Sequence, residues 1–134
     1  MKKLLSIILC LFIVFAVCGC GEKDDSYAKV TMKDGSVETL ECGEIPSLVS
    51  ENVAAYNQKY AGCKVEVVTT ISSIGSGYGT SGGHMVNLNY GWSVFIHDDD
   101  PVLIDLREGT KVKIVGNLLT QSYTIGDAKV TIIE

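Results

Sequence analysis

The side chains best suited to binding a metal ion in this sequence are grouped at His97-Asp98-Asp99-Asp100. Imidazole and carboxylate groups are common ligands of zinc, calcium and magnesium in proteins. Adjacent residues of an extended chain point to opposite sides, however, and Pro101 follows directly. We therefore interpret the segment as a solvated loop that ends a strand, and we predict neither a metal site nor a cofactor. His84 is expected to be a surface histidine, because no acidic residue stands at a useful spacing from it.

Sequence motifs for catalysis and for phosphate binding are not found. A glycine-rich stretch runs from Ile74 to Gly83, but it lacks the GxGxxG spacing, and no Lys-Ser/Thr pair leads from it into a helix. No serine stands in a GxSxG setting, and neither Cys42 nor Cys63 has a histidine near it in sequence. We predict a flexible loop for the glycine-rich stretch, and we expect the protein not to be an enzyme.

The N-terminus begins with Lys2 and Lys3, which precede an apolar run from Leu4 to Val17. As a helix this run would be about 21 Å long at ~1.5 Å per residue. A membrane span must cross a hydrocarbon core of about 30 Å, so the run is too short for one. A charged start followed by an apolar run of this length is typical of a signal peptide.

The residues that follow, Val17-Cys18-Gly19-Cys20, resemble the lipobox of bacterial lipoproteins. The thiol of Cys20 would accept diacylglycerol, and the small residue before it would admit the signal peptidase. Cleavage before Cys18 is disfavoured, because Val17 would then precede the cut. We predict a signal peptide over residues 1–19 and a lipid anchor on Cys20, which places the domain outside the cytoplasm on the cell membrane, or on an outer membrane if the source has one. An ordinary signal peptide with an incidental cysteine is the alternative.

Length and composition indicate that the mature chain is one acidic domain. Residues 20–27 are the lipidated cysteine and a short run of small and charged residues, which predicts a flexible tether. Residues 28–134 have the length of one domain. Removal of two signal-peptide lysines leaves nine basic against sixteen acidic residues, a net charge of −7. An acidic domain repels phosphate backbones, so we expect no nucleic-acid partner.

Residues 28–41 predict a β-hairpin, because two alternating runs flank a turn at Lys33-Asp34-Gly35. A helix with one apolar stripe is expected next, from Ser47 to Tyr60. The polar residues 50–52 could break this helix in two.

Cys42 and Cys63 flank the predicted helix. A straight helix of this length is about 21 Å long, whereas a disulfide needs Cα atoms within about 7 Å. We therefore predict that the two cysteines are not bonded to each other.

The rest of the chain predicts five short strands, with a helical turn at residues 102–106. The strands are expected at residues 64–71, 84–90, 92–97, 110–119 and 128–133. This order predicts a mainly β domain: a five-stranded OB-fold barrel with a preceding amphipathic helix and an N-terminal accessory hairpin. The predicted core is apolar and comes from the helix and all five strands: Val53, Tyr56, Val65, Val67, Ile71, Val86, Leu88, Val94, Ile96, Val112, Ile114, Val130 and Ile132.

Several segments carry a resemblance to a known family. They are Glu51-Asn52 with Ala54-Ala55, Lys59 to Val67, Ile71 to Ile74, and Glu108 to Gly116. Through them the stretch from about Ser50 to the C-terminus resembles the bacterial lipoprotein family of the tRNA-anticodon-like OB-fold. Thr69 departs from the family pattern, which usually has glycine there. The resemblance implies a small anchored OB domain, and fold alone does not fix a function.

OB-folds bind ligands along their second and third strands and the adjoining loops. Alternation turns Asn87 and Asn89 outward with Met85, and Phe95 outward with Ser93 and His97. It turns Val86, Leu88 and Tyr90 inward, as it does Trp92, Val94 and Ile96. Tyr78, and on the other side Tyr123, would flank the outer face. The candidate ligand-binding residues are thus Tyr78, Asn87, Asn89 and Phe95.

Stacking aromatics with amide donors suit an uncharged or basic ligand. We therefore expect a membrane-anchored, extracytoplasmic binding module for a sugar, a peptide or a protein partner in the cell envelope. The alternatives are a structural envelope lipoprotein without a small ligand and, less favoured by the charge, a surface nucleic-acid binder.

Replacement of the lipid-bearing thiol tests the anchor. Cys20→Ala should abolish incorporation of a fatty-acid analogue in metabolic labelling and leave the precursor uncleaved, because no other atom of residue 20 can accept diacylglycerol. Equal labelling of the wild type and the variant would contradict lipidation at this position.

Overall fold

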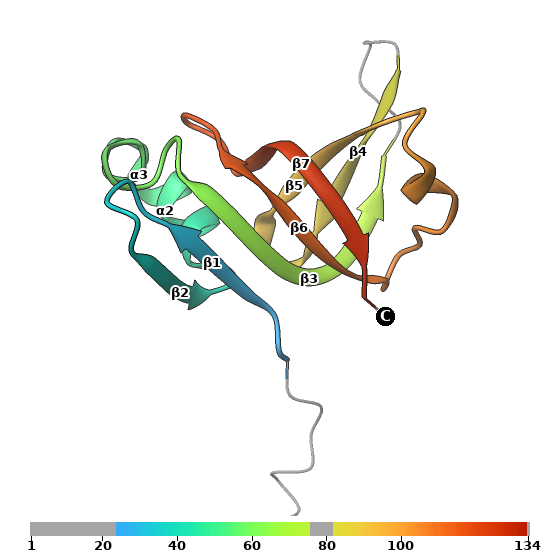
Figure 1. Cartoon of the computed structure of the whole chain (residues 1–134), viewed down its shortest axis with the longest axis horizontal. Helices are drawn as coiled ribbons and strands as arrows, with labels where there is room; N and C mark the ends of the chain where they lie inside the picture. The colour runs from blue at the N-terminus through green and yellow to red at the C-terminus, as the bar shows by residue number, and fades with distance from the viewer. Residues whose placement is uncertain (1–23, 76–81, 134) are drawn as a thin grey trace, which may run out of the picture.

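The computed structural model describes residues 24–75 and 82–133. Five strands close into a barrel: β3 (Lys64–Ile74), β4 (Gly83–Leu88), β5 (Ser93–His97), β6 (Lys111–Leu118) and β7 (Thr124–Ile132) (Figure 1). β3 pairs antiparallel with both β4 and β6, β7 pairs antiparallel with β6, and β5 runs parallel to β7 and completes the closure. The chain is therefore mainly β with an OB-fold-like barrel, as predicted.

The predicted hairpin extends the barrel wall. β1 (Tyr27–Thr31) and β2 (Val37–Glu41) are joined by a turn in which Gly35 has φ +87°, a conformation that favours glycine. β1 pairs with the first half of β3, and β4 pairs with its second half from Ile71 onward. β1 and β4 thus share the edge of β3 that β6 does not use.

Two short helices lie at the end of the barrel where β3 begins and β6 ends (Figure 1). They are α2 (Glu44–Glu51) and α3 (Val53–Lys59), so the helix expected from Ser47 to Tyr60 is broken in two. The break is at Asn52, within the residues 50–52 where the sequence left this alternative open. Asn52 has non-helical backbone angles, and its side-chain oxygen accepts a hydrogen bond from the Ala55 N–H at 3.0 Å. This side-chain cap begins a second helix, since an N-cap residue cannot itself be helical.

The core is close to the one predicted. Most of the predicted residues are buried, among them Tyr56, whose hydroxyl donates to the Leu119 carbonyl at 2.6 Å. Val53 is 39% exposed, because it is the first residue of α3 and lies outside the buried stripe. Val130 and Ile132 are half-buried and pack against the core from the last strand.

Cys42 and Cys63 are both buried and unbonded, which confirms the prediction for this pair. The helix between them is broken, so a straight helix is not what separates them. Each thiol instead contacts a backbone carbonyl: that of Val68 at 4.0 Å from Cys42, and that of Lys59 at 3.9 Å from Cys63.

The described part of the predicted tether contacts the barrel. Asp25 forms an ion pair with Lys111, and the Ser26 hydroxyl lies 3.3 Å from that of Thr69. β1 begins directly afterwards, at Tyr27. Residues 20–23 lie outside the described residues, as do the signal segment, Cys20 and residues 76–81 of the glycine-rich stretch.

The predicted helical turn is present as a short 3-10 turn, η2 (Pro101–Ile104). The Asp100 carboxylate caps it by accepting a hydrogen bond from the Val102 N–H at 3.0 Å. Within residues 24–75 and 82–133, no helix is long and apolar enough to cross a membrane.

A close backbone approach between β6 and β7 provides a test of the barrel. A Cβ added at Gly116 would lie 2.5 Å from the Gly126 carbonyl oxygen, which is backbone and cannot rotate away. Gly116→Ala should therefore lower the free energy of unfolding by about 2 kcal/mol, measured by chemical denaturation. Gly43→Ala, whose added Cβ would meet Tyr90 at an ordinary 3.6 Å, is the control. Equal stability of the two variants would contradict this closure.

Candidate binding groove

The two predicted asparagines tie the β4 segment to β3. Asn87 is exposed, and its side-chain N–H donates to the Ser73 hydroxyl at 3.1 Å. Asn89 is also exposed, but it lies in the turn after β4, where its side chain donates to the Thr70 hydroxyl. Both amides therefore already hold partners within the fold. Tyr78, the third candidate, lies outside the described residues.

Phe95 has a packing role in the outer wall. A Cβ added at Gly83 would lie 2.3 Å from the Phe95 ring, so this ring rests on the glycine backbone of the neighbouring strand. The His97 ring meets Phe95 edge to face, with the ring centroids 5.1 Å apart. Ser93, which was predicted to face outward, is 4% exposed, because its hydroxyl bonds that of Thr124 where β5 meets β7. Ser93 and Phe95 therefore both take part in contacts between strands.

His84 has an acidic partner, contrary to the prediction. Its Nε2 lies 3.1 Å from a carboxylate oxygen of Asp98, and its Nδ1 lies 3.1 Å from the Gly75 carbonyl oxygen. The side chain is 40% exposed, as expected for a surface histidine. The pairing of β4 with β5 brings the two residues together although they are fourteen positions apart in sequence. A search for partners at short sequence spacing does not find such a pair. Among the described residues, no group of three or more His, Cys, Asp or Glu is placed to hold a metal ion.

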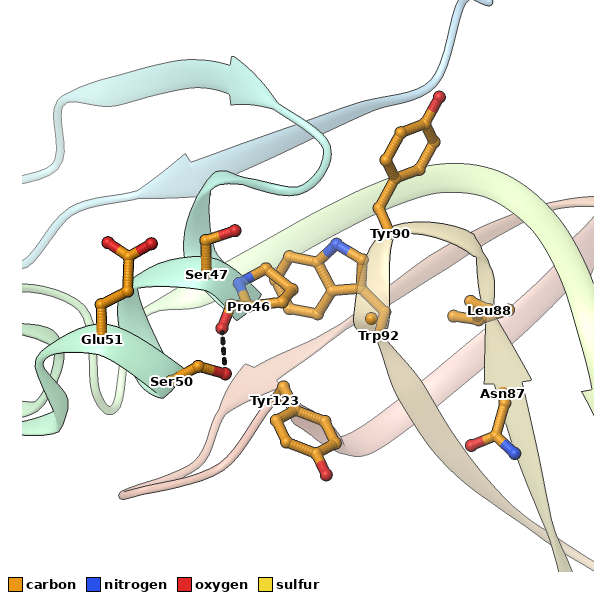
Figure 2. Close-up of a pocket in the computed structure, with 10 residues that line it drawn as sticks. Pro46, Ser47, Ser50, Glu51, Asn87, Leu88, Tyr90, Trp92 and Tyr123 are labelled. Atoms are coloured by element: carbon orange, nitrogen blue, oxygen red, sulfur yellow. Dashed lines mark hydrogen bonds between the residues drawn. The ribbon is translucent and has the colours of Figure 1, made fainter.

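A groove of about 560 Å³ opens between α2 and the turn that joins β4 to β5. Figure 2 shows Tyr90 and Tyr123 on opposite sides of Trp92, which comes from the start of β5, and α2 along the remaining side. The lining combines aromatic, hydroxyl, amide and carboxylate groups: Pro46, Ser47, Ser50, Glu51, Asn87, Leu88, Tyr90, Gly91, Trp92 and Tyr123.

The aromatic residues of the groove are exposed to different degrees. Tyr90 is 46% exposed and Tyr123 is 47% exposed, whereas Trp92 is 1% exposed. Tyr90 was predicted to face the core, but β4 ends at Leu88 and the chain reverses, with Tyr90 at φ 68°. A left-handed backbone at a bulky residue is strained by about 1–3 kcal/mol. The reversal places the Tyr90 ring at the surface.

Trp92 joins the groove to the body of the protein. Its indole N–H donates to the Cys42 carbonyl at 2.6 Å, a buried hydrogen bond that joins the start of β5 to the segment before α2. Gly91 approaches Pro46 of α2 so closely that an added Cβ would lie 3.1 Å from it. These two contacts hold α2 against the turn that carries Tyr90.

A second hollow of about 490 Å³ adjoins the groove and shares Ser47 and Tyr90 with it. Its lining includes three carboxylates, from Asp24, Glu41 and Glu44. Tyr90 thus stands between two hollows. Together these two hollows are called the paired groove below.

Of the three predicted ligand-binding residues that the structure describes, Asn87 lines the paired groove, and Asn89 and Phe95 do not. Tyr123 was predicted to lie beside the outer face, and it lines the paired groove. Tyr90 and Trp92 were assigned to the core by alternation, and α2 had no assigned role in binding. The signal that could have identified Tyr90 is the glycine after it, because Tyr90-Gly91 is a sequence at which a strand can reverse.

We compared the chain with protein-family models, with curated proteins and with solved structures, and none of the three comparisons gave a match.

The buried thiol beside the paired groove gives a prediction for alkaline pH. Burial raises the pKa of Cys42 from its usual value near 9 to about 11. Above pH 9 the unfolded chain loses this proton while the folded chain keeps it, so the free energy of unfolding falls as pH rises from 9 to 11.

Burial also raises the pKa of Tyr56 from 10 to about 12, so its contribution begins one pH unit higher. Between pH 9 and 10 we therefore expect a loss of about 1 kcal/mol from Cys42, measured by urea denaturation. Cys42→Ala should remove this loss, although the cavity lowers its stability at every pH. An unchanged pH dependence in Cys42→Ala would show that the buried thiol is not its source.

Proposed function

We propose that this protein is a lipoprotein anchored outside the cytoplasm through Cys20, and that its OB-fold domain binds a partner without catalysing a reaction. The signal segment and the Val17-Cys18-Gly19-Cys20 box support the anchor. The resemblance to the lipoprotein family of the tRNA-anticodon-like OB-fold supports the same class. The OB-fold-like barrel is compatible with binding, since such barrels serve as recognition modules.

The proposed binding site is the paired groove. The observation that carries this is the placement of Tyr90, a half-exposed aromatic ring held on a left-handed backbone between two hollows. Glycine would occupy this position without strain. A strained, exposed tyrosine costs stability, which is typical of a residue kept for binding.

The side chains that line the groove suit a ligand with both apolar and polar groups. A pocket of about 560 Å³ is in the range of small-ligand sites. Tyr90 and Tyr123 offer ring faces for stacking, and Asn87, Ser47 and Ser50 offer polar groups around them. The Ser50 hydroxyl already donates to the Pro46 carbonyl at 3.2 Å, so its lone pairs remain for a ligand (Figure 2). A sugar or an extended peptide segment of an envelope partner fits this description.

Removal of the two tyrosine rings tests the site. In a pull-down from envelope extracts, Tyr90→Gly and Tyr123→Ala should each lower recovery of partner at least fivefold. Glycine tolerates φ 68°, so we expect the thermal midpoint of Tyr90→Gly to stay within a few degrees of that of the wild type.

Val37→Ala is the matched control, because Val37 is 56% exposed on β2 and lines neither hollow. Recovery should be unchanged in this variant. Equal recovery by all variants would place the binding surface elsewhere.

A further inference from the structure

We propose that the paired groove binds a basic peptide segment, with one lysine or arginine side chain on each side of Tyr90. This inference rests on the proposed function and names the ligand class of that same site. It is carried by the charges that line the two hollows and by the position of the Tyr90 ring between them.

Among the described residues, every charged side chain that lines the paired groove is acidic. Glu51 belongs to the first hollow, and Asp24, Glu41 and Glu44 belong to the second. All four are exposed. No described lysine, arginine or histidine lines either hollow.

The ion pairs seen among the described residues lie outside the paired groove. Within residues 24–75 and 82–133, the ion pairs join Lys59 to Glu38, His84 to Asp98, and Lys111 to Asp25. None of them involves a carboxylate of the paired groove. The Asp24 side chain does accept a hydrogen bond from the Ser26 N–H at 3.1 Å. The negative charge of the groove therefore remains available to a cationic ligand.

Three of the described lysines point outward from the strands of the barrel. Along β6, Val112 and Ile114 are fully buried, so the alternation turns Lys113 to the outer side of the barrel. Lys64 and Lys129 face outward on β3 and β7 by the same argument. None of these three lysines lines the paired groove, so a basic ligand would meet acidic groups there.

The aromatic rings add a second kind of contact for a cation. Ammonium and guanidinium groups are attracted to the face of a tyrosine ring. Tyr90 offers a ring to both hollows, and Tyr123 offers another at the far side of the first hollow (Figure 2). An extended peptide places alternate side chains on the same side of its backbone, about 7 Å apart. Two cations with one residue between them could therefore enter the two hollows on either side of Tyr90.

This arrangement excludes anionic ligands and distinguishes basic ligands from neutral ones. A phosphate or carboxylate ligand would meet four like charges. A neutral sugar could stack on the tyrosines but would gain nothing from the second, acidic hollow. Because the carboxylates are exposed, the attraction is screened by salt, with a Debye length of about 10 Å at 0.1 M.

The test is a titration followed through the fluorescence of Trp92, the only tryptophan of the chain. Trp92 is buried in the wall of the groove, and its emission should change when a ligand covers that wall. The mature lipoprotein in neutral detergent is titrated separately with four probes. These are the peptide Lys-Ala-Lys-Ala, its glutamate and serine counterparts, and a tetramer of N-acetylglucosamine. Lys-Ala-Lys-Ala should bind at least tenfold more tightly than the other three, and at least tenfold more weakly in 0.5 M than in 0.05 M salt.

Two double variants with the same change in net charge locate the effect. Glu44→Gln with Glu51→Gln should weaken binding of Lys-Ala-Lys-Ala at least fivefold. Asp99→Asn with Glu108→Gln removes two exposed carboxylates outside the groove, and it should change binding less than twofold. Equal weakening by the two pairs would overturn the proposal, because binding would then follow net charge alone.

The remaining outcomes separate this inference from the proposed function. If the sugar or the serine peptide binds best and Tyr90→Gly abolishes that binding, the groove is a binding site but its ligand is not basic. If no probe changes the fluorescence and the tyrosine variants recover envelope partners as well as the wild type, both proposals fail.

Discussion

Two strands, β1 and β4, pair with successive parts of the edge of β3 that faces away from β6. The position of the candidate site depends on the point where one strand ends and the other begins. β1 pairs with β3 as far as Val68, and β4 takes over from Ile71. Between these two points, the hydroxyls of Thr69 and Thr70 bind the start of the described chain and the turn after β4. Two segments thus diverge from one edge at this point. Tyr90 and the second hollow lie where they separate.

A closed barrel leaves few ways to build a site, because its interior is filled by side chains. In this protein the core includes Trp92 and Tyr56 at the end covered by the helices, so no ligand can enter there. On the proposed function, the binding site is at the rim, where α2 meets the turn that carries Tyr90. The broken helix makes this possible, since a short α2 can lie against Gly91 while α3 continues into β3. The break at Asn52 and the groove are therefore linked by packing.

The sequence predicted the elements well but did not predict the paired groove, for identifiable physical reasons. Alternation predicts which side chains face the core only as far as the strand continues. β4 ends two residues before Tyr90, so the prediction does not apply to this ring, which lies on the surface. Helical periodicity does not register the cap at Asn52, because the apolar stripe continues across it. The contact of His84 with Asp98 depends on the register of two strands, which no local motif records. The burial of a side chain can be predicted from the apolar pattern of its own strand or helix. A groove depends on where segments that are distant in sequence meet, which that pattern does not record.

The proposed anchor limits how far the paired groove can lie from the membrane. Asp24 lines the second hollow, and only residues 21–23 separate it from Cys20. Even fully extended, the chain from Cys20 to Asp24 reaches about 14 Å. On the proposed lipidation the second hollow is therefore held close to the membrane surface, where a folded partner has little room to approach it. An extended segment can lie along the membrane and enter from the side. The shortness of the tether thus favours the extended peptide proposed for the groove.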